Sequence, residues 1–171
     1  MAVLEILKYP HPVLKKRCEP VDHVDEAIRK LVQDMRETMY CANGIGLAAC
    51  QVGVSCRVLV MDVGAVDPAQ KFFALINPEI VAEDGEIDYE EGCLSVPDCN
   101  EKIRRREKVR VRGISLDGEA VELAGEGILA IALQHEIDHL NGILILDRIS
   151  RLKREIYRKR LKKEREKGER D

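Results

Sequence analysis

The five residues His135 to His139, with the sequence HEIDH, constrain the fold of this chain more than any other stretch. On a helix, side chains four residues apart lie on one face about one turn apart. Two imidazoles at that spacing can therefore hold a single metal ion. Glu136 projects about 100° around the helix from His135, so its carboxylate can reach a metal-bound water without being a ligand. The arrangement suits metal-assisted hydrolysis, because the metal lowers the pKa of the water and the carboxylate takes its proton.

The sequence around this motif is apolar, which indicates a helix buried deep in a domain. The apolar residues are Ile128, Leu129, Ile131, Ala132, Leu133 and Leu140. Buried histidines need polar partners, and an alternative interpretation is two core histidines that are satisfied by hydrogen bonds alone. That alternative does not explain the glutamate between them. The other two histidines, His11 and His23, lie in a polar N-terminal stretch and are expected at the surface.

A catalytic metal needs a third protein ligand and an open position. No histidine follows His139, and the downstream acids lie beside or within a dense run of charge, where a solvated role is expected. Upstream, Cys93 stands in the sequence EEGCLSVP, directly after a glycine that lets the backbone approach a ligand closely. Thiolate is a strong ligand for zinc or ferrous iron. Cys93 is therefore the better candidate for the third ligand.

The six cysteines show no CxxC pair and no regular spacing. The first ten residues lack the basic start and long apolar run of a secretory signal. We therefore expect a cytoplasmic protein whose thiols are mostly free. No apolar run reaches the roughly 18 residues that are needed to span a membrane, so we expect no membrane association.

A third motif, GIGLAACQ, covers residues 44–51. It is not a dinucleotide-binding fingerprint, because no GxGxxG is present and no strand leads into it. One interpretation is a loop that opens a strand or turn of small residues. The functional interpretation rests on Gln51, whose side-chain amide could donate to an oxyanion that develops near a metal.

The segments GIGLAACQ, EGCLS and QHEIDHL, in this order and with this spacing, resemble the three signature motifs of the peptide deformylases. The opening VLEIL before Tyr9-Pro10, and the later Ile76-Asn77-Pro78, are also typical of that family, so the resemblance covers nearly the whole chain. It implies a metal-dependent hydrolase that removes the formyl group from the N-terminal formyl-methionine of nascent polypeptides and releases formate. Its substrates would be N-formyl-methionyl nascent peptides.

The resemblance also implies the catalytic roles. Cys93, His135 and His139 would bind one divalent metal, with water as the fourth ligand. Glu136 would act as general base and then as proton donor to the leaving amine. Gln51 and the backbone N–H of Leu94 would stabilise the oxyanion. The metal that the family implies is Fe²⁺, with Zn²⁺, Ni²⁺ or Co²⁺ as substitutes.

The substrate contacts that the resemblance implies lie in the same motifs. Gly44, Ile45 and Gly46, with Leu94, would line a groove in which the peptide lies extended beside a strand. The methionine side chain would lie against Ile131, Ala132 and His135. One position departs from the family: many members carry an arginine seven residues after the metal-binding cysteine, where this chain has Asn100. A nearby arginine (Arg104, Arg105 or Arg106) would have to serve instead, or the substrate contacts would be weaker.

The rest of the chain indicates one α+β domain, with antiparallel sheets packed around the metal-binding helix and a further helix towards each end. Asp25 to Tyr40 has the apolar periodicity of a helix, with Asp25 as its N-cap. Asp84-Gly85 and Asp117-Gly118 are signals for two hairpins. The expected helices cover residues 25–40, 126–140 and 148–171, and the expected strands cover residues 57–63, 72–77, 79–83, 86–89, 108–115 and 120–123.

The distribution of charge distinguishes two segments of the same domain. Residues 1–147 are the catalytic part, and residues 148–171 are a basic C-terminal helix or tail. The tail contains 12 Lys+Arg and 5 Asp+Glu, a net charge of +7, whereas the whole chain carries −3, so residues 1–147 carry −10. An apolar stripe of Ile149, Leu152, Ile156 and Leu161 predicts that the first turns of this helix dock on the domain.

Such a charge run is commonly a solvated, fraying helix, but it can also bind RNA. The C-terminal helix is implicated in ribosome contact in the deformylase family, so we expect this chain to contact the ribosome there. The acidic first part argues against general binding of DNA or other nucleic acids.

Two other functions use some of the same residues. A zinc endopeptidase with the HExxH motif would need a third ligand downstream and would tolerate replacement of Cys93. A non-catalytic relative that only binds ribosomes would have lost Glu136, Gln51 or a metal ligand, yet all of them are present. The deformylase interpretation therefore accounts for the most residues.

Overall fold

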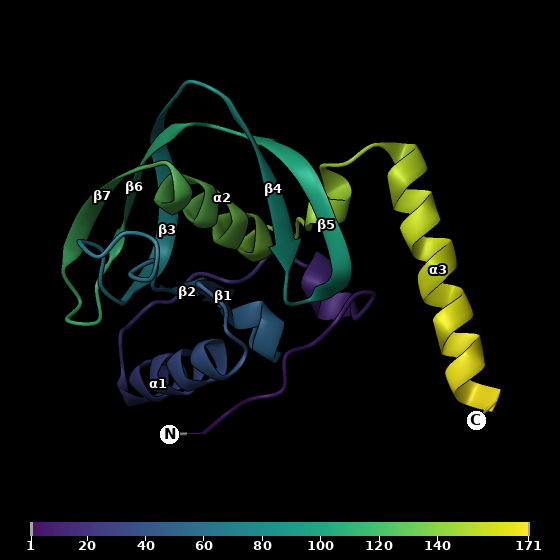
Figure 1. Cartoon of the computed structure of the whole chain (residues 1–171). Helices are drawn as coiled ribbons and strands as arrows, with labels where there is room; N and C mark the ends of the chain where they lie inside the picture. The colour runs from purple at the N-terminus through teal and green to yellow at the C-terminus, as the bar shows by residue number, and fades with distance from the viewer. Residues whose placement is uncertain (1, 171) are drawn as a thin grey trace.

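The computed structural model of the chain describes residues 2–170 and has the expected α+β architecture (Figure 1). A five-stranded antiparallel sheet has the order β1-β2-β3-β6-β7, and a two-stranded antiparallel sheet pairs β4 with β5. The strands are β1 Gly46–Ala48, β2 Val58–Met61, β3 Phe73–Asp84, β4 Ile87–Cys93, β5 Val96–Arg105, β6 Lys108–Ile114 and β7 Ala120–Glu126. The helices are α1 Glu26–Cys41, α2 Ile128–Leu140 and α3 Arg151–Arg170, with short 3-10 turns at Pro12–Lys15, Ala49–Val52 and Ile145–Asp147.

Helices α1 and α2 cover opposite faces of the five-stranded sheet. Strand β2 is buried on both faces, and because side chains alternate along a strand, Val58 and Val60 pack with α1 while Leu59 and Met61 pack with α2. The start of α1 is fixed as expected, because the Asp25 carboxylate accepts a hydrogen bond of 3.0 Å from the Ile28 N–H. Helix α2 lies in the middle of the molecule, between the two sheets (Figure 1).

The predicted hairpin at Asp117-Gly118 is confirmed by the pairing of β6 with β7, but the predicted hairpin at Asp84-Gly85 is wrong. Strand β3 pairs with β6, and β4 pairs with β5, so Asp84 lies opposite Lys108 and Ile87 lies opposite Arg105. The chain therefore passes from one sheet to the other at Gly85, alongside the return passage from β5 to β6.

Charge explains why β3 and β4 do not pair with each other. Residues 79–91 carry seven Asp+Glu and no Lys or Arg, whereas residues 102–112 carry seven Lys+Arg and one Glu. Like charges directly across a strand pair are unfavourable and opposite charges are favourable. The acidic ribbon accordingly pairs with the basic one, and Arg104 contacts Asp88, Arg106 contacts Glu83 and Arg112 contacts Glu79.

Two further differences from the expected strands have local causes. Residues 72–77 and 79–83 form one strand, β3, that is interrupted by an irregularity between Ile76 and Glu79, where Asn77 has a positive φ of 52°. The sequence after Cys93 indicates only a short strand-like run that is interrupted at Pro97, because proline cannot donate a ladder hydrogen bond, whereas the structure has a ten-residue strand, β5. Pro97 is tolerated because β5 pairs with β4 alone, which leaves its other edge without a neighbouring strand.

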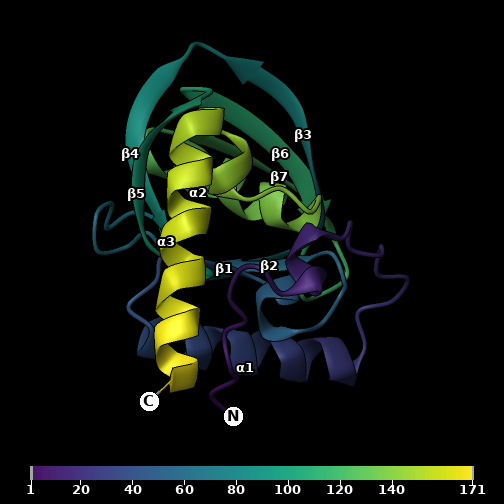
Figure 2. The same cartoon turned by 90° about the vertical axis from the view of Figure 1, so that its right-hand side faces the viewer.

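Helix α3 docks on the rest of the molecule beside β5 (Figure 2). Its anchor is Tyr157, which is buried and donates a 2.9 Å hydrogen bond to the carbonyl oxygen of Pro97. Ile149 and Leu161 pack on the same cluster, as expected, but Leu152 and Ile156 are 71% and 57% exposed. The predicted docking stripe is therefore wrong at these two positions, and Tyr157 takes their place. None of the helices described for residues 2–170 is long and apolar enough to cross a membrane.

Candidate metal centre

Three potential metal ligands converge from two separate elements. Helix α2 brings His135 and His139 to one face, one turn apart. Cys93 is the last residue of β4 and pairs with Val96, so that Leu94 and Ser95 form a two-residue turn into β5. The ligand atoms of Cys93, His135 and His139 all lie within 4.8 Å of one another, the one such group found among the described residues.

The spacing of these atoms fits a metal ion of ordinary size. His135 Nε2 and His139 Nε2 are 3.2 Å apart, and Cys93 Sγ is 3.3 Å from His139 Nε2. A tetrahedral zinc ion with ordinary bond lengths separates two nitrogens by roughly 3.3 Å and a nitrogen from a sulfur by roughly 3.5 Å. The donor set of one thiolate and two imidazoles suits zinc or ferrous iron. These residues can hold one divalent metal ion and leave a position open towards the cavity.

The two histidines differ in their surroundings. His135 Nδ1 lies 2.9 Å from Glu91 Oε1, so its Nε2 is left to face the metal position. Burial lowers the pKa of His135, but the neighbouring Cys93 and Glu91 outweigh that effect and raise it well above its ordinary value. Burial and the nearby His135 hold the pKa of His139 well below its ordinary value. A metal ion replaces any proton at these nitrogens when it binds.

The carboxylate of Glu136 is buried, and Oε2 has no hydrogen-bond partner within residues 2–170. Burial raises its pKa to about 7. The neighbouring strand leaves room for it only because residue 46 is glycine: a Cβ atom there would lie 2.7 Å from Glu136 Oε1. A carboxylate with a pKa near neutrality can both accept and return a proton.

Gln51 is held at both ends of its amide. Its Oε1 accepts a 3.0 Å hydrogen bond from the Ala48 N–H, and its Nε2 donates a 3.0 Å hydrogen bond to Ser95 Oγ. The Nε2 group also lies 4.0 Å from Cys93 Sγ, so the amide N–H groups face the metal position. Leu94 follows Cys93 directly, in the turn between β4 and β5. Both residues line the same cavity as Cys93.

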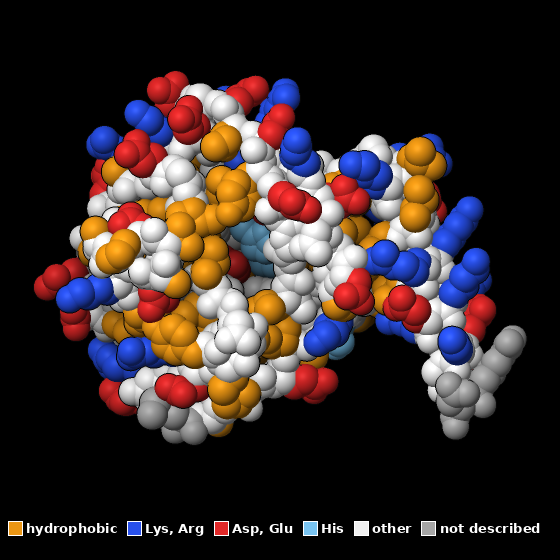
Figure 3. Space-filling view, viewed as in Figure 1, with side chains coloured by type: hydrophobic (Ala, Val, Ile, Leu, Met, Phe, Trp, Pro, Cys, Tyr) orange, Lys and Arg blue, Asp and Glu red, His pale blue; other side chains and the backbone are white. Residues whose placement is uncertain are grey.

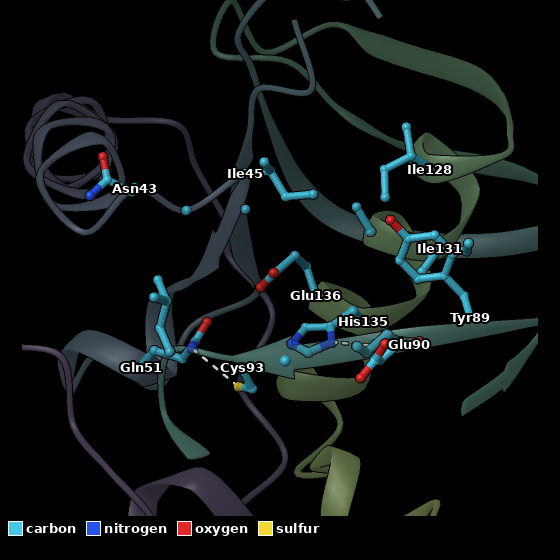
Figure 4. A pocket seen from close by; sticks show the side chains of 16 residues that line it. Asn43, Ile45, Gln51, Tyr89, Glu90, Cys93, Ile128, Ile131, His135 and Glu136 are labelled. Atoms are coloured by element: carbon cyan, nitrogen blue, oxygen red, sulfur yellow. Dashed lines mark hydrogen bonds and ion pairs between the residues drawn. The ribbon is translucent and has the colours of Figure 1, made fainter. Parts of the chain in front are cut away.

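A cavity of about 400 Å³ opens onto this group of residues. The space-filling view shows the hollow with histidine at its floor and hydrophobic side chains around it (Figure 3). Its walls are made by Asn43, Gly44, Ile45, Gly46, Gln51, Tyr89, Glu90, Glu91, Gly92, Cys93, Leu94, Ile128, Ile131, Ala132, His135 and Glu136. In the close view, Cys93, His135 and Glu136 surround one space, while Ile128, Ile131 and Tyr89 lie together at one end (Figure 4).

Two strand edges face this cavity. Strand β1 is at the end of the five-stranded sheet and β4 pairs only with β5, so each has one edge without a neighbouring strand. Residues 43–46, which lead into β1, and residues 89–94, which end β4 and begin the turn after it, line the cavity. Unpaired backbone groups on a strand edge can pair with an added extended chain.

All the residues singled out from the sequence line this cavity or form its metal position, but the arginines considered in place of Asn100 do not. Arg105 is buried and its side chain pairs with Glu91, and none of Arg104, Arg105 and Arg106 lines the cavity. Asn100 Oδ1 lies 2.8 Å from where a Cβ of Gly92 would be, so it packs against the β4 backbone. None of the three arginines therefore takes the place of the missing one in the cavity wall, and weaker substrate contacts at this position stay a prediction.

Sequence reasoning missed several residues that support the site. Glu91, Ser95 and Asp138 lie inside the recognised motifs, and each is buried and hydrogen-bonded to another residue of the site or to an arginine. Their signal was a polar residue between apolar neighbours, which predicts a buried partner. Arg105 gave no such signal, because it stands in a run of three arginines of which only the middle one is buried.

Comparison with known proteins relates the chain to one family. The sequence profile described as polypeptide deformylase matches residues 3–155. A peptide deformylase of Thermodesulfovibrio yellowstonii is 52% identical over 162 residues, which cover 95% of this chain and 98% of that protein. A crystal structure of a peptide deformylase from Legionella pneumophila has a TM-score of 0.90 at 45% identity and covers 99% of both chains. Another, from Ehrlichia chaffeensis in complex with actinonin, has a TM-score of 0.91 at 41% identity and covers 96% of this chain and 98% of that one.

Proposed function

Because the chain belongs to the polypeptide deformylase family, we propose that Cys93, His135 and His139 hold a divalent metal ion with which it deformylates N-formyl-methionyl peptides. Enzymes of this family are metal-dependent hydrolases of protein biosynthesis that remove the formyl group from nascent peptides. The observation that carries the proposal is the cluster of three ligand atoms at the floor of the cavity, with the Glu136 carboxylate beside it.

A divalent metal ion held by these residues would act as a Lewis acid that lowers the pKa of a water molecule and polarises the formyl carbonyl. Glu136 is the general base that takes the proton from the water as the water oxygen bonds to the formyl carbon. The same carboxyl group then delivers the proton to the nitrogen of the leaving amine as the carbon–nitrogen bond breaks, and formate is released. Burial of Glu136, which raises its pKa to about 7, suits both halves of this transfer.

Gln51 Nε2 and the backbone N–H of Leu94 hold the formyl oxygen as negative charge develops on it. The contacts of Gln51 with Ala48 and Ser95 fix its amide before substrate binds, and donors placed in advance are the effective ones. Removing such a donor typically costs about 10²–10³ in rate. Gln51→Ala should therefore lower kcat more than it raises KM, whereas an effect confined to KM would restrict Gln51 to holding the substrate.

The peptide lies extended between the free edges of β1 and β4, with Gly44, Ile45, Gly46 and Leu94 along it. Main-chain hydrogen bonds to strand edges do not depend on the side chains of the peptide, which suits an enzyme that accepts many nascent chains. The methionine side chain lies against Ile131 and Ala132, which α2 presents to the apolar end of the cavity. Asn100 contributes no charge to this groove, so we expect no ion pair between this position and the peptide backbone.

The proposed native metal is Fe²⁺, with Zn²⁺, Ni²⁺ and Co²⁺ as substitutes. One thiolate and two imidazoles suit all of these ions, so the preference for iron rests on the family. Formylated nascent chains arise on ribosomes, which places the proposed activity in the cytoplasm. We also propose that residues 148–171, with their net charge of +7, contact ribosomal RNA, because clustered Lys and Arg bind phosphate backbones.

The test is release of formate from formyl-Met-Ala-Ser by anaerobically purified protein. Acetyl-Met-Ala-Ser and a longer unformylated peptide are the controls. We expect formate and free Met-Ala-Ser from the first peptide only. Internal cleavage of the unformylated peptide would instead indicate an endopeptidase, and absence of formate from metal-loaded protein would refute the proposal.

A further inference from the structure

A chain of four charged side chains runs from His135 to the surface behind the cavity. Glu91 Oε1 contacts His135 Nδ1 at 2.9 Å, and the same carboxylate pairs with Arg105 through two hydrogen bonds of 2.7 and 2.8 Å. Arg105 donates a third, of 2.6 Å, to Asp138 Oδ2. Asp138 in turn accepts two from Arg148, of 2.5 and 2.7 Å. We refer to Glu91, Arg105, Asp138 and Arg148 as the ligand-support chain.

The ligand-support chain has no net charge, and its members nearest to His135 are almost fully buried. The side chains of Arg105, Glu91 and Asp138 are 2%, 4% and 11% exposed, whereas Arg148 is 38% exposed. Two carboxylates alternate with two guanidinium groups, and buried charges are tolerated only when they are paired in this way. Arg148 is therefore the outer member that completes the pairing of a buried carboxylate.

The members come from four parts of the sequence. Glu91 is on β4, Arg105 ends β5, Asp138 is on α2 between the two metal-binding histidines, and Arg148 follows the short turn Ile145–Asp147. Arg148 is also the first residue of the basic tail as charge defines it. The start of the tail is thus linked to His135 by side-chain contacts that include Asp138 of α2.

We propose that Arg148 is a positioning residue of the metal centre, which acts through Asp138 and Arg105 to hold Glu91 against His135. The inference rests on the proposed metal-binding role of His135. Without Arg148, the Asp138 carboxylate keeps Arg105 as its only side-chain partner. Asp138 then attracts the Arg105 guanidinium more strongly and weakens its contact with Glu91. A looser Glu91 no longer fixes the ring orientation of His135, and loss of such support typically weakens metal binding by about 10–100-fold.

The sign of the effect separates this role from simple electrostatics. Removing a positive charge near a bound divalent cation would, by charge alone, strengthen metal binding. The positioning role predicts the opposite. For the Arg148→Gln variant we expect zinc affinity to fall on the order of tenfold, the lower end of the range for groups that orient metal ligands.

The experiment measures zinc affinity of the full chain by competition with a chelator of known affinity, for the wild type and for Arg148→Gln, Arg148→Lys and Arg151→Gln. Arg151 is the matched control, because it is exposed at the start of α3 and outside the ligand-support chain. Its variant should bind zinc as the wild type does. Lysine keeps the charge but lacks the two-pronged contact, so Arg148→Lys should lose zinc affinity, but less than Arg148→Gln does.

A second measurement follows the Nδ1–H of His135 in the zinc-loaded protein by ¹⁵N-edited NMR. We expect this proton to exchange faster with solvent in Arg148→Gln and to recover in the double variant Asp138→Asn/Arg148→Gln, because Arg105 is then left to Glu91. Zinc affinity should recover in the same double variant.

Unchanged or tighter zinc binding in Arg148→Gln, with an unchanged His135 signal, would overturn the proposal. If Arg148→Gln does not fold, unchanged zinc affinity in Arg148→Lys would overturn it as well. Neither readout uses deformylation, so failure of the proposed enzyme activity is detected separately from failure of this inference.

Discussion

Glu136 is buried beside the proposed metal position but is offset around the helix from both histidines, which suits the proposed role of a base and not of a ligand. Glu136→Gln keeps the shape of the side chain and removes its ability to take a proton. We expect metal content and thermal stability close to those of the wild type, and formate release lower by about two to four orders of magnitude. Steady-state kinetics and elemental analysis of the same samples check this. Near-normal turnover would remove Glu136 from the chemistry.

A substitution at Gly46 tests whether the position of the Glu136 carboxylate matters for the reaction. A methyl group at this position would lie 2.7 Å from Glu136 Oε1, so the carboxylate, which is the movable end of its side chain, must shift. Misplacing a reacting group by about 1 Å can cost 10²-fold in rate. We expect Gly46→Ala to fold and bind metal normally but to lose at least about tenfold in kcat.

The control for Gly46 is a double-mutant cycle with Glu136→Gln, measured by the same formate assay. If Gly46→Ala acts by moving the carboxylate, it should cost little more in a protein that already lacks the base. Equal losses in both backgrounds would show that Gly46 acts on the substrate groove and not through Glu136.

The proposed ligands His135 and His139 could be predicted from the sequence because four-residue spacing on a helix is a local property. Cys93 and Gln51 were singled out by residue type and neighbouring glycines and were brought to the site only by the fold. The burial of Arg105 could not have been predicted, because it depends on strand β5. The sequence of β5 contains Pro97 and a run of charged residues, which do not indicate a strand. The partners of Arg105 come from two other elements.

Among the secondary-structure elements, the two Asp-Gly turns show that a local sequence signal predicts a turn but not which strands pair. Both glycines adopt positive φ, 69° at Gly85 and 79° at Gly118, a backbone conformation that glycine favours. Only the second joins paired strands. The first differs because pairing is a long-range choice, which the charges of the distant ribbon at residues 102–112 decide.

Helix α3 has an anchored half and a free half, which should differ in their effect on stability. Truncation after Leu161 keeps Tyr157 and its contacts, whereas truncation after Ser150 removes them. We expect the shorter deletion to leave thermal unfolding and formate release unchanged and the longer one to lower the unfolding temperature by several degrees, as a loss of about 1–2 kcal/mol would in a chain of this size. Equal unfolding temperatures for both truncations would show that Tyr157 is not an anchor.

The division of α3 after Leu161 also allows a test of ribosome contact. Residues 148–161 carry seven Lys+Arg and one Glu, whereas residues 162–171 carry five Lys+Arg and four Asp+Glu. The positive charge therefore lies on the docked half. Neutralising the exposed pair Arg151 and Lys159 should weaken salt-dependent cosedimentation with ribosomes more than deleting residues 162–171 does. The reverse order would contradict RNA contact through the docked half.

The fold as a whole brings the sulfur of Cys93 and two imidazoles together, and a cavity opens onto Cys93 and His135. Ferrous iron oxidises in air, and an accessible cysteine such as Cys93 oxidises as well. If iron is the native metal, activity should decay in air or peroxide and be preserved by anaerobic handling. The comparison is with the zinc form, and equal activity of that form without oxygen sensitivity would count against iron.

One metal ion held by Cys93, His135 and His139 is what we propose that deformylation by this chain requires. The most direct measurement is formate released from formyl-Met-Ala-Ser as a function of metal bound per chain, for the wild type and Cys93→Ala. We predict that the wild-type rate rises in proportion to bound metal and saturates at one ion per chain. Cys93→Ala should lose most of its metal and its activity. Full metal binding by Cys93→Ala, or formate release that does not depend on bound metal, would contradict the account.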